Sequence, residues 1–248
     1  MISIRNLKKS YGTFHVLAGL DLDILENETL VLLGRSGVGK SVLLKHIIGI
    51  TKPDEGSIFV DGICISELSG PALYEAIRNM GMLFQGGALF DSMDVEANVA
   101  FYLKEHGDHL TGKRCTKAEI KDRVAHALEM VGLEGTEQKM PAELSGGMRK
   151  RAALARLIVY RPKVFLYDEP TTGLDPITSM QINELIVKTQ EELKATSIVV
   201  THDILSAHYV ANRMALIKEG KIAHLAKPND FIKIQDPFID FFKRVSSA

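Results

Sequence analysis

Eight consecutive residues have the composition and spacing needed to hold the phosphates of a nucleoside triphosphate. Glycines in such a loop let backbone N–H groups approach phosphate oxygens closely. A lysine supplies a cation for the β- and γ-phosphates, and a following serine hydroxyl suits Mg²⁺. The residues fit the pattern G-x-x-x-x-G-K-[ST] and read Gly34-Arg35-Ser36-Gly37-Val38-Gly39-Lys40-Ser41. They predict a triphosphate site, and a glycine turn without a ligand is the alternative.

The segments on either side of this octet predict the elements that position it. Leu30–Leu33 is a short apolar run typical of a buried strand, and the residues after Lys40 are spaced like a helix. A helix that begins near Lys40 directs the positive end of its dipole at the same phosphates. The order strand, loop and helix is the context that the motif requires, so it favours the triphosphate interpretation.

Two acids at the end of a second apolar run are candidates for metal binding and catalysis. Val164–Tyr167 predicts a strand, and Asp168 and Glu169 follow it. Asp168 is placed to fix Mg²⁺ through its water shell, and Glu169 to polarise an attacking water. Alone, such a pair more often caps a helix or lies at a solvated edge. Two further segments favour the catalytic interpretation, namely Leu144-Ser145-Gly146-Gly147-Met148 before the pair and Thr201-His202-Asp203 after it.

The Ser145 segment predicts a second anion site. The Ser145 hydroxyl and the amides of Gly146 and Gly147 lie at a predicted helix start, where the helix dipole favours negative charge.

The phosphate loop, the L-S-G-G segment, the acid pair and the histidine resemble, in this order, the ATP-binding-cassette (ABC) ATPases over essentially the whole chain. The resemblance implies an ATPase with ATP and Mg²⁺ as ligands and with Lys40, Glu169 and His202 as catalytic residues. It implies Mg²⁺ ligands at Ser41, Gln85 and Asp168. ATP contacts are implied for Tyr11, residues 34–42, Ser145, Gly146, Gly147 and Asp175.

Several of these implied roles have alternatives. Tyr11, implied to stack on adenine, is otherwise an aromatic residue of a turn. Gln85 is otherwise a surface amide, and His202 a residue at a helix start. Asp175, in Gly173-Leu174-Asp175, is implied to lie in a loop that crosses a dimer interface. The chain has one phosphate loop and one L-S-G-G segment, so the resemblance implies that two copies enclose two ATP molecules.

Two departures from the common ABC pattern indicate a branch of the family. Met148 stands where glutamine is usual, and Val42 where threonine is common. With residues 85–93 and 147–151, they resemble the ATPase subunit of Mla/Mce-type lipid transporters. This implies phospholipid or hydrophobic-molecule transport between membranes, with maintenance of outer-membrane lipid asymmetry. The implied partners are an Mla/Mce-type permease, an MCE-domain lipid-binding protein and, in some systems, an accessory cytoplasmic subunit.

The resemblance implies an α/β fold with a P-loop NTPase core around a parallel sheet, an N-terminal antiparallel β subdomain and an inserted α-helical subdomain. Residues 1–91 and 159–225 are assigned to the core with the β subdomain, 92–158 to the helical subdomain, and 226–248 to a helical tail.

Local patterns predict further elements. Thr116 and Glu119 predict a capping box at a helix start, and residues 104–114 predict a surface loop. In the tail, Phe238, Phe241, Phe242 and Val245 predict one apolar face, which packs on the parent domain or docks on a partner.

Bulk properties limit the other classes of function. The net charge of −1 gives no electrostatic footprint for nucleic acid, so we expect no nucleic-acid partner. Cys64 and Cys115 lie far apart, which favours a reducing compartment. No apolar run is long enough to cross a bilayer, and the N-terminus predicts a strand rather than a signal peptide. Together with these properties, the Mla/Mce resemblance implies a peripheral protein at the cytoplasmic face of the bacterial inner membrane.

Three other functions stay open on the sequence. One is the ATPase of an ABC transporter for another solute. Another is a soluble ABC ATPase acting on ribosomes or DNA, which usually shows two cassettes or a coiled-coil insertion. The last is a non-catalytic nucleotide sensor, against which Lys40, Asp168, Glu169 and His202 all argue.

Overall fold

The chain divides into two compact units. Met1–Ile77 together with Ala195–Ala248 forms the first unit, and Arg78–Lys194 forms the second. The structure is a computed structural model that describes residues 1–246, and the side chains of residues 1–241. The predicted subdomain boundaries at residues 92, 158 and 226 follow the family pattern and stay a prediction.

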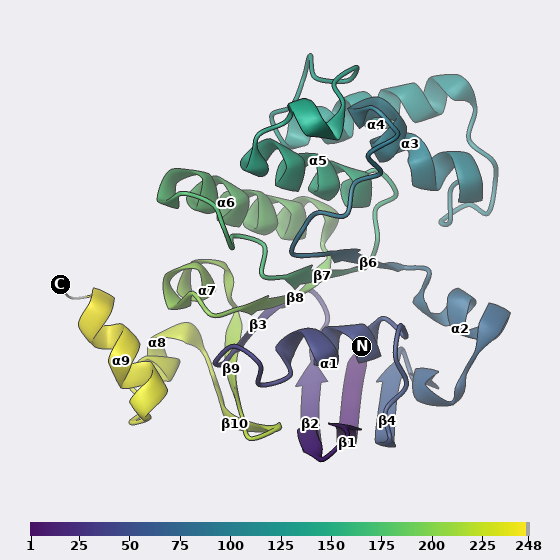
Figure 1. Ribbon diagram of the computed structural model, residues 1–248. Helices are drawn as coiled ribbons and strands as arrows, with labels where there is room; N and C mark the ends of the chain where they lie inside the picture. Colours follow the sequence, from purple (N-terminus) through teal and green to yellow (C-terminus); the bar gives the residue numbers. More distant parts are fainter. Residues whose placement is uncertain (247–248) are drawn as a thin grey trace. The chain divides into compact units, whose positions relative to one another are not determined.

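Four strands of the first unit form an antiparallel sheet in the order β2-β1-β4-β5 (Figure 1). These strands are β1 Ile2–Tyr11, β2 Phe14–Ile24, β4 Glu55–Val60 and β5 Ile63–Cys64. In β2, Leu20, Leu22 and Ile24 are buried, whereas Asp21 and Asp23 are exposed. This alternation is typical of a strand with one face in the core and one face in solvent.

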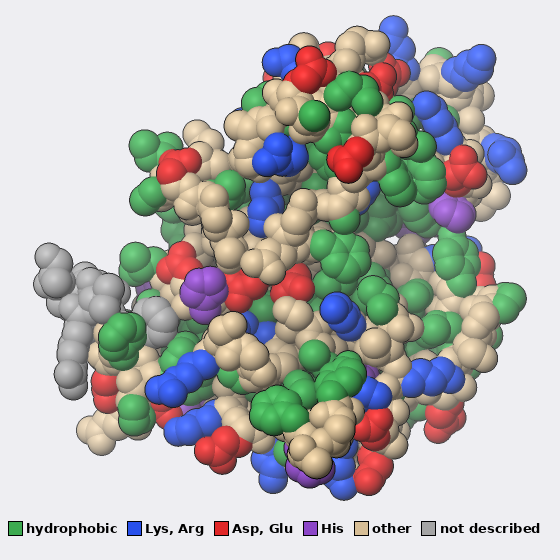
Figure 2. Space-filling model, in the orientation of Figure 1, with side chains coloured by type: hydrophobic (Ala, Val, Ile, Leu, Met, Phe, Trp, Pro, Cys, Tyr) green, Lys and Arg blue, Asp and Glu red, His purple; other side chains and the backbone are tan. Residues whose placement is uncertain are grey.

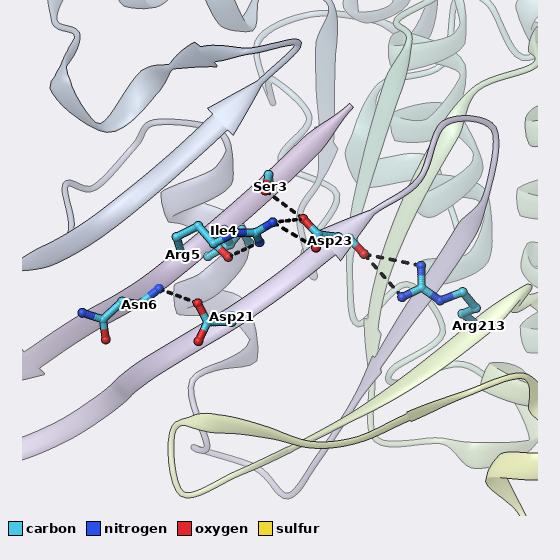
Figure 3. Close-up of polar contacts among 7 residues, drawn as sticks. All are labelled: Ser3, Ile4, Arg5, Asn6, Asp21, Asp23 and Arg213. Atoms are coloured by element: carbon cyan, nitrogen blue, oxygen red, sulfur yellow. Dashed lines mark hydrogen bonds and ion pairs between the residues drawn. The ribbon is translucent and has the colours of Figure 1, made fainter.

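A polar network joins this antiparallel sheet to the strand β9, Arg213–Lys218 (Figure 3). On β2, Asp23 accepts hydrogen bonds from Ser3 Oγ and Arg5 Nη2, each at 2.8 Å. Arg213 Nη1 donates to the carbonyl oxygen of Asp23 at 3.4 Å and to Glu28 Oε1 at 2.9 Å. The half-exposed Arg5–Asp23 pair adds little stability by itself. Arg213 instead fixes the end of β2 relative to β9.

A second, mixed sheet of the first unit positions the phosphate loop. Its strands run in the order β10-β9-β3-β8, where β3 pairs in parallel with both β8 and β9, and β10 pairs antiparallel with β9. Every residue of β3 (Thr29–Leu33) and β8 (Thr196–Thr201) is buried, as expected of strands covered on both faces. β10 spans Lys221–Ala226. The helices of this unit are α1 Lys40–Ile47, α2 Gly70–Ile77, α7 Ile204–Val210, α8 Pro228–Phe231 and α9 Pro237–Ser246, with a 3₁₀ turn at Ile65–Glu67.

The second unit combines a parallel strand pair with helices (Figure 1). β6 (Met80–Leu83) pairs with β7 (Val164–Asp168). Thr116 and Glu119 form the predicted capping box, with Thr116 N donating to Glu119 Oε2 at 2.7 Å. The helices are α3 Val95–His106, α4 Lys117–Met130, α5 Gly146–Ile158 and α6 Pro176–Leu193, with a 3₁₀ turn at Pro141–Glu143.

The prediction of a surface loop over residues 104–114 is wrong in part. α3 continues to His106, and Asp108 and His109 are buried. Arg123 Nη2 donates to Asp108 Oδ2 at 2.8 Å, and the His109 ring lies edge-on to Tyr160 at 5.9 Å between centroids. These partners, distant in sequence, draw a polar segment inward.

The predicted apolar face of the tail is also corrected. In α9, Ile239 is fully buried, whereas Phe241 is 62% exposed and Phe238 is half-buried. Asp236 accepts a hydrogen bond from Phe238 N at 2.8 Å and lies 3.6 Å from His224 Nε2, which sets where the helix begins and which side faces inward. The predicted contributions of Phe242 and Val245 lie outside the described side chains. Within residues 1–246, no helix combines the length and apolarity required to cross a membrane.

Candidate functional site

The phosphate loop follows β3 and is shaped by close backbone packing. A Cβ on Gly34 would lie 2.8 Å from the carbonyl oxygen of Ile217, and one on Gly39 would lie 2.7 Å from Val16 Cγ1. Gly39 also has a φ of 102°, in the left-handed region that favours glycine. Side chains at these positions would displace the loop, so glycine is required there for packing as well as for access of the backbone to phosphate.

Lys40 is buried within this loop and braces it. Its Nζ donates to the carbonyl oxygens of Gly34 at 2.8 Å and Arg35 at 3.2 Å. Lys40 is also the first residue of α1, whose first turn carries no acidic side chain. The cation and the positive end of the helix dipole therefore act on the same place, the environment that an anionic phosphate needs. Ser41 and Val42 are half-buried, and Arg35, Ser36 and Gly37 are exposed around them.

His202 lies at the same sheet edge as the phosphate loop. Leu33 and Thr201 are paired in register where the parallel strands β3 and β8 end, so Gly34 and His202 follow side by side. Asp203, rather than His202, caps α7, because Asp203 Oδ1 accepts a hydrogen bond from Leu205 N at 2.9 Å. The exposed His202 is therefore not required as the start of that helix.

Tyr11 ends β1 opposite Phe14 and is 52% exposed. Lys9 Nζ lies 5.7 Å from the centroid of its ring. A ring with one face against a cation and much of its surface in solvent suits stacking on a base and equally suits a turn. Both interpretations of Tyr11 stand.

In the second unit, Gln85 and the acid pair share a sheet edge. Leu83 of β6 is paired in register with Tyr167 of β7, and Gln85 and Asp168 follow these residues. Gln85 is exposed, whereas Asp168 is 7% exposed. Amide and carboxylate oxygens at one edge are ligands that Mg²⁺ accepts.

Glu169 is held in an unusual backbone conformation. Its φ is 50°, in the left-handed region that non-glycine residues seldom adopt. Thr172 Oγ1 donates to its carboxylate at 3.1 Å. The nearest following helix, α6, is capped by Asp175, so neither acid of the pair serves as a helix cap.

The L-S-G-G segment and Asp175 are brought together at two helix starts. Ser145 is the N-cap of α5, and its Oγ accepts a hydrogen bond from Met148 N at 3.2 Å. Ser145 and Gly146 are exposed, but Gly147 is buried so closely against Thr178 that a Cβ would lie 2.5 Å from Thr178 Cγ2. The hydroxyl of Thr178 in turn donates to Asp175 at 2.6 Å. This hydrogen bond lowers the pKa of the Asp175 carboxyl.

Three residues at this edge were not among the sequence candidates. Thr172 contacts Glu169, Thr178 contacts Asp175, and the buried Lys150 of α5 donates from Nζ to the carbonyl oxygen of Glu169 at 3.2 Å. Burial lowers the pKa of Lys150, and the charges of Glu169 and Asp168 oppose that shift. The signal for Lys150 was its spacing, because a lysine occupies the stripe of α5 that is otherwise apolar.

The surface charge is mixed. Figure 2 shows acidic and basic side chains interspersed over the face that is drawn, in keeping with the net charge of −1. Any preference for an anionic ligand therefore rests on local features such as Lys40 and the helix starts.

Known proteins that share this order of motifs were found by comparison. The profile of the ABC transporter family matches residues 17–172. A probable ribonucleotide transport ATP-binding protein of Mycobacterium leprae is 45% identical over 216 residues, 87% of this chain and 60% of that protein. The chain thus spans about 60% of the length of this mycobacterial relative. The intermembrane phospholipid transport system ATP-binding protein MlaF of Haemophilus influenzae is 40% identical over 236 residues, 95% of this chain and 87% of that protein.

A solved structure extends the likeness to the fold. The dimeric ATP-binding cassette MJ0796, in a post-hydrolysis state with ADP and Pi, superposes with a TM-score of 0.81 at 32% identity. The match covers 92% of this chain and 99% of that cassette. The predicted fold class is confirmed.

Proposed function

This chain belongs to the ABC transporter family, and from that premise we propose that it binds and hydrolyses MgATP, with two copies enclosing two ATP molecules. The family confirms the predicted resemblance and the ATPase class. The observation that carries the proposal is the glycine loop with Lys40 inside it at the start of α1. A dimeric cassette with ADP and Pi among the similar structures supports both hydrolysis and pairing.

The residues of the first unit bind the triphosphate. The backbone amides of residues 34–41 donate hydrogen bonds to the phosphate oxygens, and Lys40 neutralises charge on the β- and γ-phosphates. Tyr11 stacks on the adenine. His202 contacts the γ-phosphate and orders the attacking water. The position of His202 beside the end of β3 supports that role.

The second unit supplies two of the proposed metal ligands, Gln85 and Asp168, together with the base and the partner contact. Ser41 of the first unit, Gln85 and Asp168 offer only oxygen ligands, which fits a hard divalent cation. Mg²⁺, when bound, neutralises phosphate charge. The Glu169 carboxylate accepts the proton of the water that attacks the γ-phosphate. Ser145, Gly146 and Gly147 hold the ATP of the second copy, and Asp175 lies in the loop that crosses to that copy.

The transported cargo is proposed to be a phospholipid or a similar hydrophobic molecule. MlaF supports this because the similarity covers nearly all of this chain and most of that protein. The partners are then a permease of the Mla/Mce type, an MCE-domain lipid-binding protein and an accessory cytoplasmic subunit. The chain is peripheral on the cytoplasmic face of the inner membrane, and its work maintains outer-membrane lipid asymmetry. The similar mycobacterial protein, which is named for ribonucleotide transport, favours another solute as the second candidate.

The hydrolysis proposal is tested with Glu169→Gln. We expect ATP binding to be kept and phosphate release to fall by about 100-fold or more, because general-base catalysis is lost. The ATP-bound variant should elute as a dimer by light scattering. Glu191→Gln changes an exposed acid on α6 in the same way and should hydrolyse ATP at the parent rate. Turnover by Glu169→Gln at the parent rate would show that Glu169 is not the base.

The cargo proposal is tested separately. The chain is purified from its native membrane in mild detergent, and the bound permease and lipids are identified by mass spectrometry. A permease of the Mla/Mce type with co-purifying phospholipid supports lipid transport. A permease for another solute would remove the lipid proposal and leave the ATPase proposal standing.

A further inference from the structure

Lys150 occupies a position in α5 that an apolar residue would normally fill. Gly147, Lys150, Leu154 and Leu157 recur at helical spacing, and all four are buried. Lys150 itself is only 6% exposed. An ammonium group removed from water is costly unless specific partners compensate for its lost hydration.

The partners of Lys150 are the acid pair. Its Nζ donates to the carbonyl oxygen of Glu169 at 3.2 Å. The negative charges of Glu169 and Asp168 also favour the ammonium form, although burial opposes it and lowers the pKa of Lys150. The contact made by the lysine is therefore to the backbone of Glu169, while its charge is balanced by the neighbouring carboxylates.

The backbone of Glu169 needs such support. Its φ of 50° is costly for a residue with a Cβ, and such conformations persist where surrounding contacts determine them. The carbonyl oxygen of Glu169 accepts hydrogen bonds from Lys150 Nζ and from Thr172 N at 3.3 Å. At the other end of the residue, Thr172 Oγ1 donates to the carboxylate at 3.1 Å. Backbone and side chain of Glu169 are thus both fixed.

We propose that Lys150 is a positioning residue that holds the Glu169 backbone in its left-handed conformation and so aims the carboxylate at the attacking water. The proposal rests on the proposed function of Glu169 as the base in ATP hydrolysis. Lys150 lies in the same helix that Ser145 caps, so the helix whose start receives one ATP also sets the base that acts on another. Lys150 thereby ties the two ATP sites of a dimer through one side chain.

The first test is Lys150→Met, which keeps the length of the side chain and removes its donor and charge. We expect kcat for ATP hydrolysis to fall by about 100-fold, the effect typical of a misplaced catalytic group. The Kd for ATP should stay within about twofold, because Lys150 is not among the proposed ATP contacts. Lys150→Arg, which can still donate to the carbonyl oxygen, should recover most of the lost kcat.

Arg151→Met is the matched control. Arg151 is the next residue in α5, and its Nη1 donates to the carbonyl oxygen of Gly132 at 3.1 Å. The Arg151→Met variant therefore loses the same kind of bond, from a cationic side chain to a backbone carbonyl, but at Gly132 rather than at Glu169. We expect its kcat to be unchanged. An equal loss of kcat in both variants would overturn the proposal, because the effect would then be a general weakening of α5.

A double variant separates positioning from structural support. If Lys150 acts through Glu169, adding Lys150→Met to Glu169→Gln should not lower the residual hydrolysis rate further. A further fall of similar size would overturn the proposal. If Lys150→Met does not fold by circular dichroism, Lys150→Gln replaces it. That side chain is too short to keep the contact, so parent kcat in Lys150→Gln would also overturn the proposal. Loss of activity in Glu169→Gln beside parent kcat in Lys150→Met would refute the positioning role alone.

Discussion

Residues 34–41 in the first unit and residues 145–178 in the second unit hold charged groups by different means. The phosphate loop is continuous in sequence, and its shape depends on glycines and backbone amides, with Lys40 bonded to the loop itself. The second region is assembled from three segments, which are the first turns of α5, the turn that contains Glu169 and the start of α6. There, side chains of one segment hold the backbone or side chains of another, as Lys150 holds Glu169.

This difference predicts how each region fails. In the phosphate loop, the buried Lys40 is the cation bonded to the loop itself, so its removal should strongly weaken ATP binding, whereas loss of an exposed charge nearby should do little. In the second region, the tight Gly147–Thr178 contact and the Thr178–Asp175 hydrogen bond form a chain. A small change at one end of that chain should therefore reach the other end.

The largest effect is expected for Lys40→Ala in the phosphate loop. We expect ATP affinity to fall by about 100-fold or more, because the main charge that compensates the phosphates is lost together with its bonds to Gly34 and Arg35. Hydrolysis should fall with it. Equilibrium binding of a fluorescent ATP analogue measures the affinity.

Lys45→Ala is the control for that variant. Lys45 is exposed on the same helix, so the substitution removes one positive charge without changing the phosphate loop. Its ATP affinity should stay within about twofold of the parent value. Equal losses in the two variants would mean that net charge, rather than the bonded ammonium of Lys40, governs binding.

A smaller effect is expected for Gly147→Ala in the second region. The added Cβ would lie 2.5 Å from Thr178 Cγ2, and Thr178 is fixed by its hydrogen bond to Asp175. Overpacking of this kind lowers the free energy of unfolding by about 1–3 kcal/mol. Thr178→Ser removes the clashing methyl and keeps the hydroxyl, so it should restore most of that loss. Chemical denaturation of the single and double variants measures the coupling.

Gly146→Ala tests whether the clash is specific. Its Cβ would lie 3.7 Å from Leu174 Cδ2, an ordinary contact, and we expect the free energy of unfolding to change by less than about 1 kcal/mol. If Thr178→Ser failed to restore Gly147→Ala, the close approach of α5 to Thr178 would not be the cause of the loss.

The same difference explains what could be predicted from the sequence. The phosphate loop and the Thr116 capping box are local, and both were found because a motif and its flanking periodicity occur within a few residues. The ends of β3 and β7 were close to their predicted places for the same reason. Family resemblance, rather than periodicity, supplied the joint roles of the distant segments.

The errors arose where partners lie far apart in the chain. Asp108 was predicted at the surface, but its ion pair with Arg123 buries it. The phase of α9 was wrong because Asp236, which precedes that helix, is held by the distant His224 at 3.6 Å. The place of Lys150 in the apolar stripe of α5 was a signal, but its role was overlooked because its partner, a backbone carbonyl 19 residues away, is not encoded by any residue type.

The smallest effect concerns the charge of Asp175 at the far end of the chain of contacts. The hydrogen bond from Thr178 lowers the pKa of this carboxyl below its ordinary value of 3.8. A lowered pKa means that the ionised form stabilises the folded state. That contribution is complete above the unfolded pKa and is lost as the pH falls through the lower folded pKa.

Thr178→Val keeps the size of the side chain and removes its hydroxyl. The backbone amides of Ile177 and Thr178 still donate to Asp175 at 3.0 Å each, so the cap of α6 stays while the largest cause of the pKa shift is gone. We expect the pKa of Asp175, followed by the ¹³C shift of its carboxyl, to rise toward 3.8. As that pKa rises, the melting temperature of the variant should depend slightly less on pH in the acid range. An unchanged pKa would mean that the helix start of α6 alone stabilises the charge, and that the second region depends less on side chains than its contacts indicate.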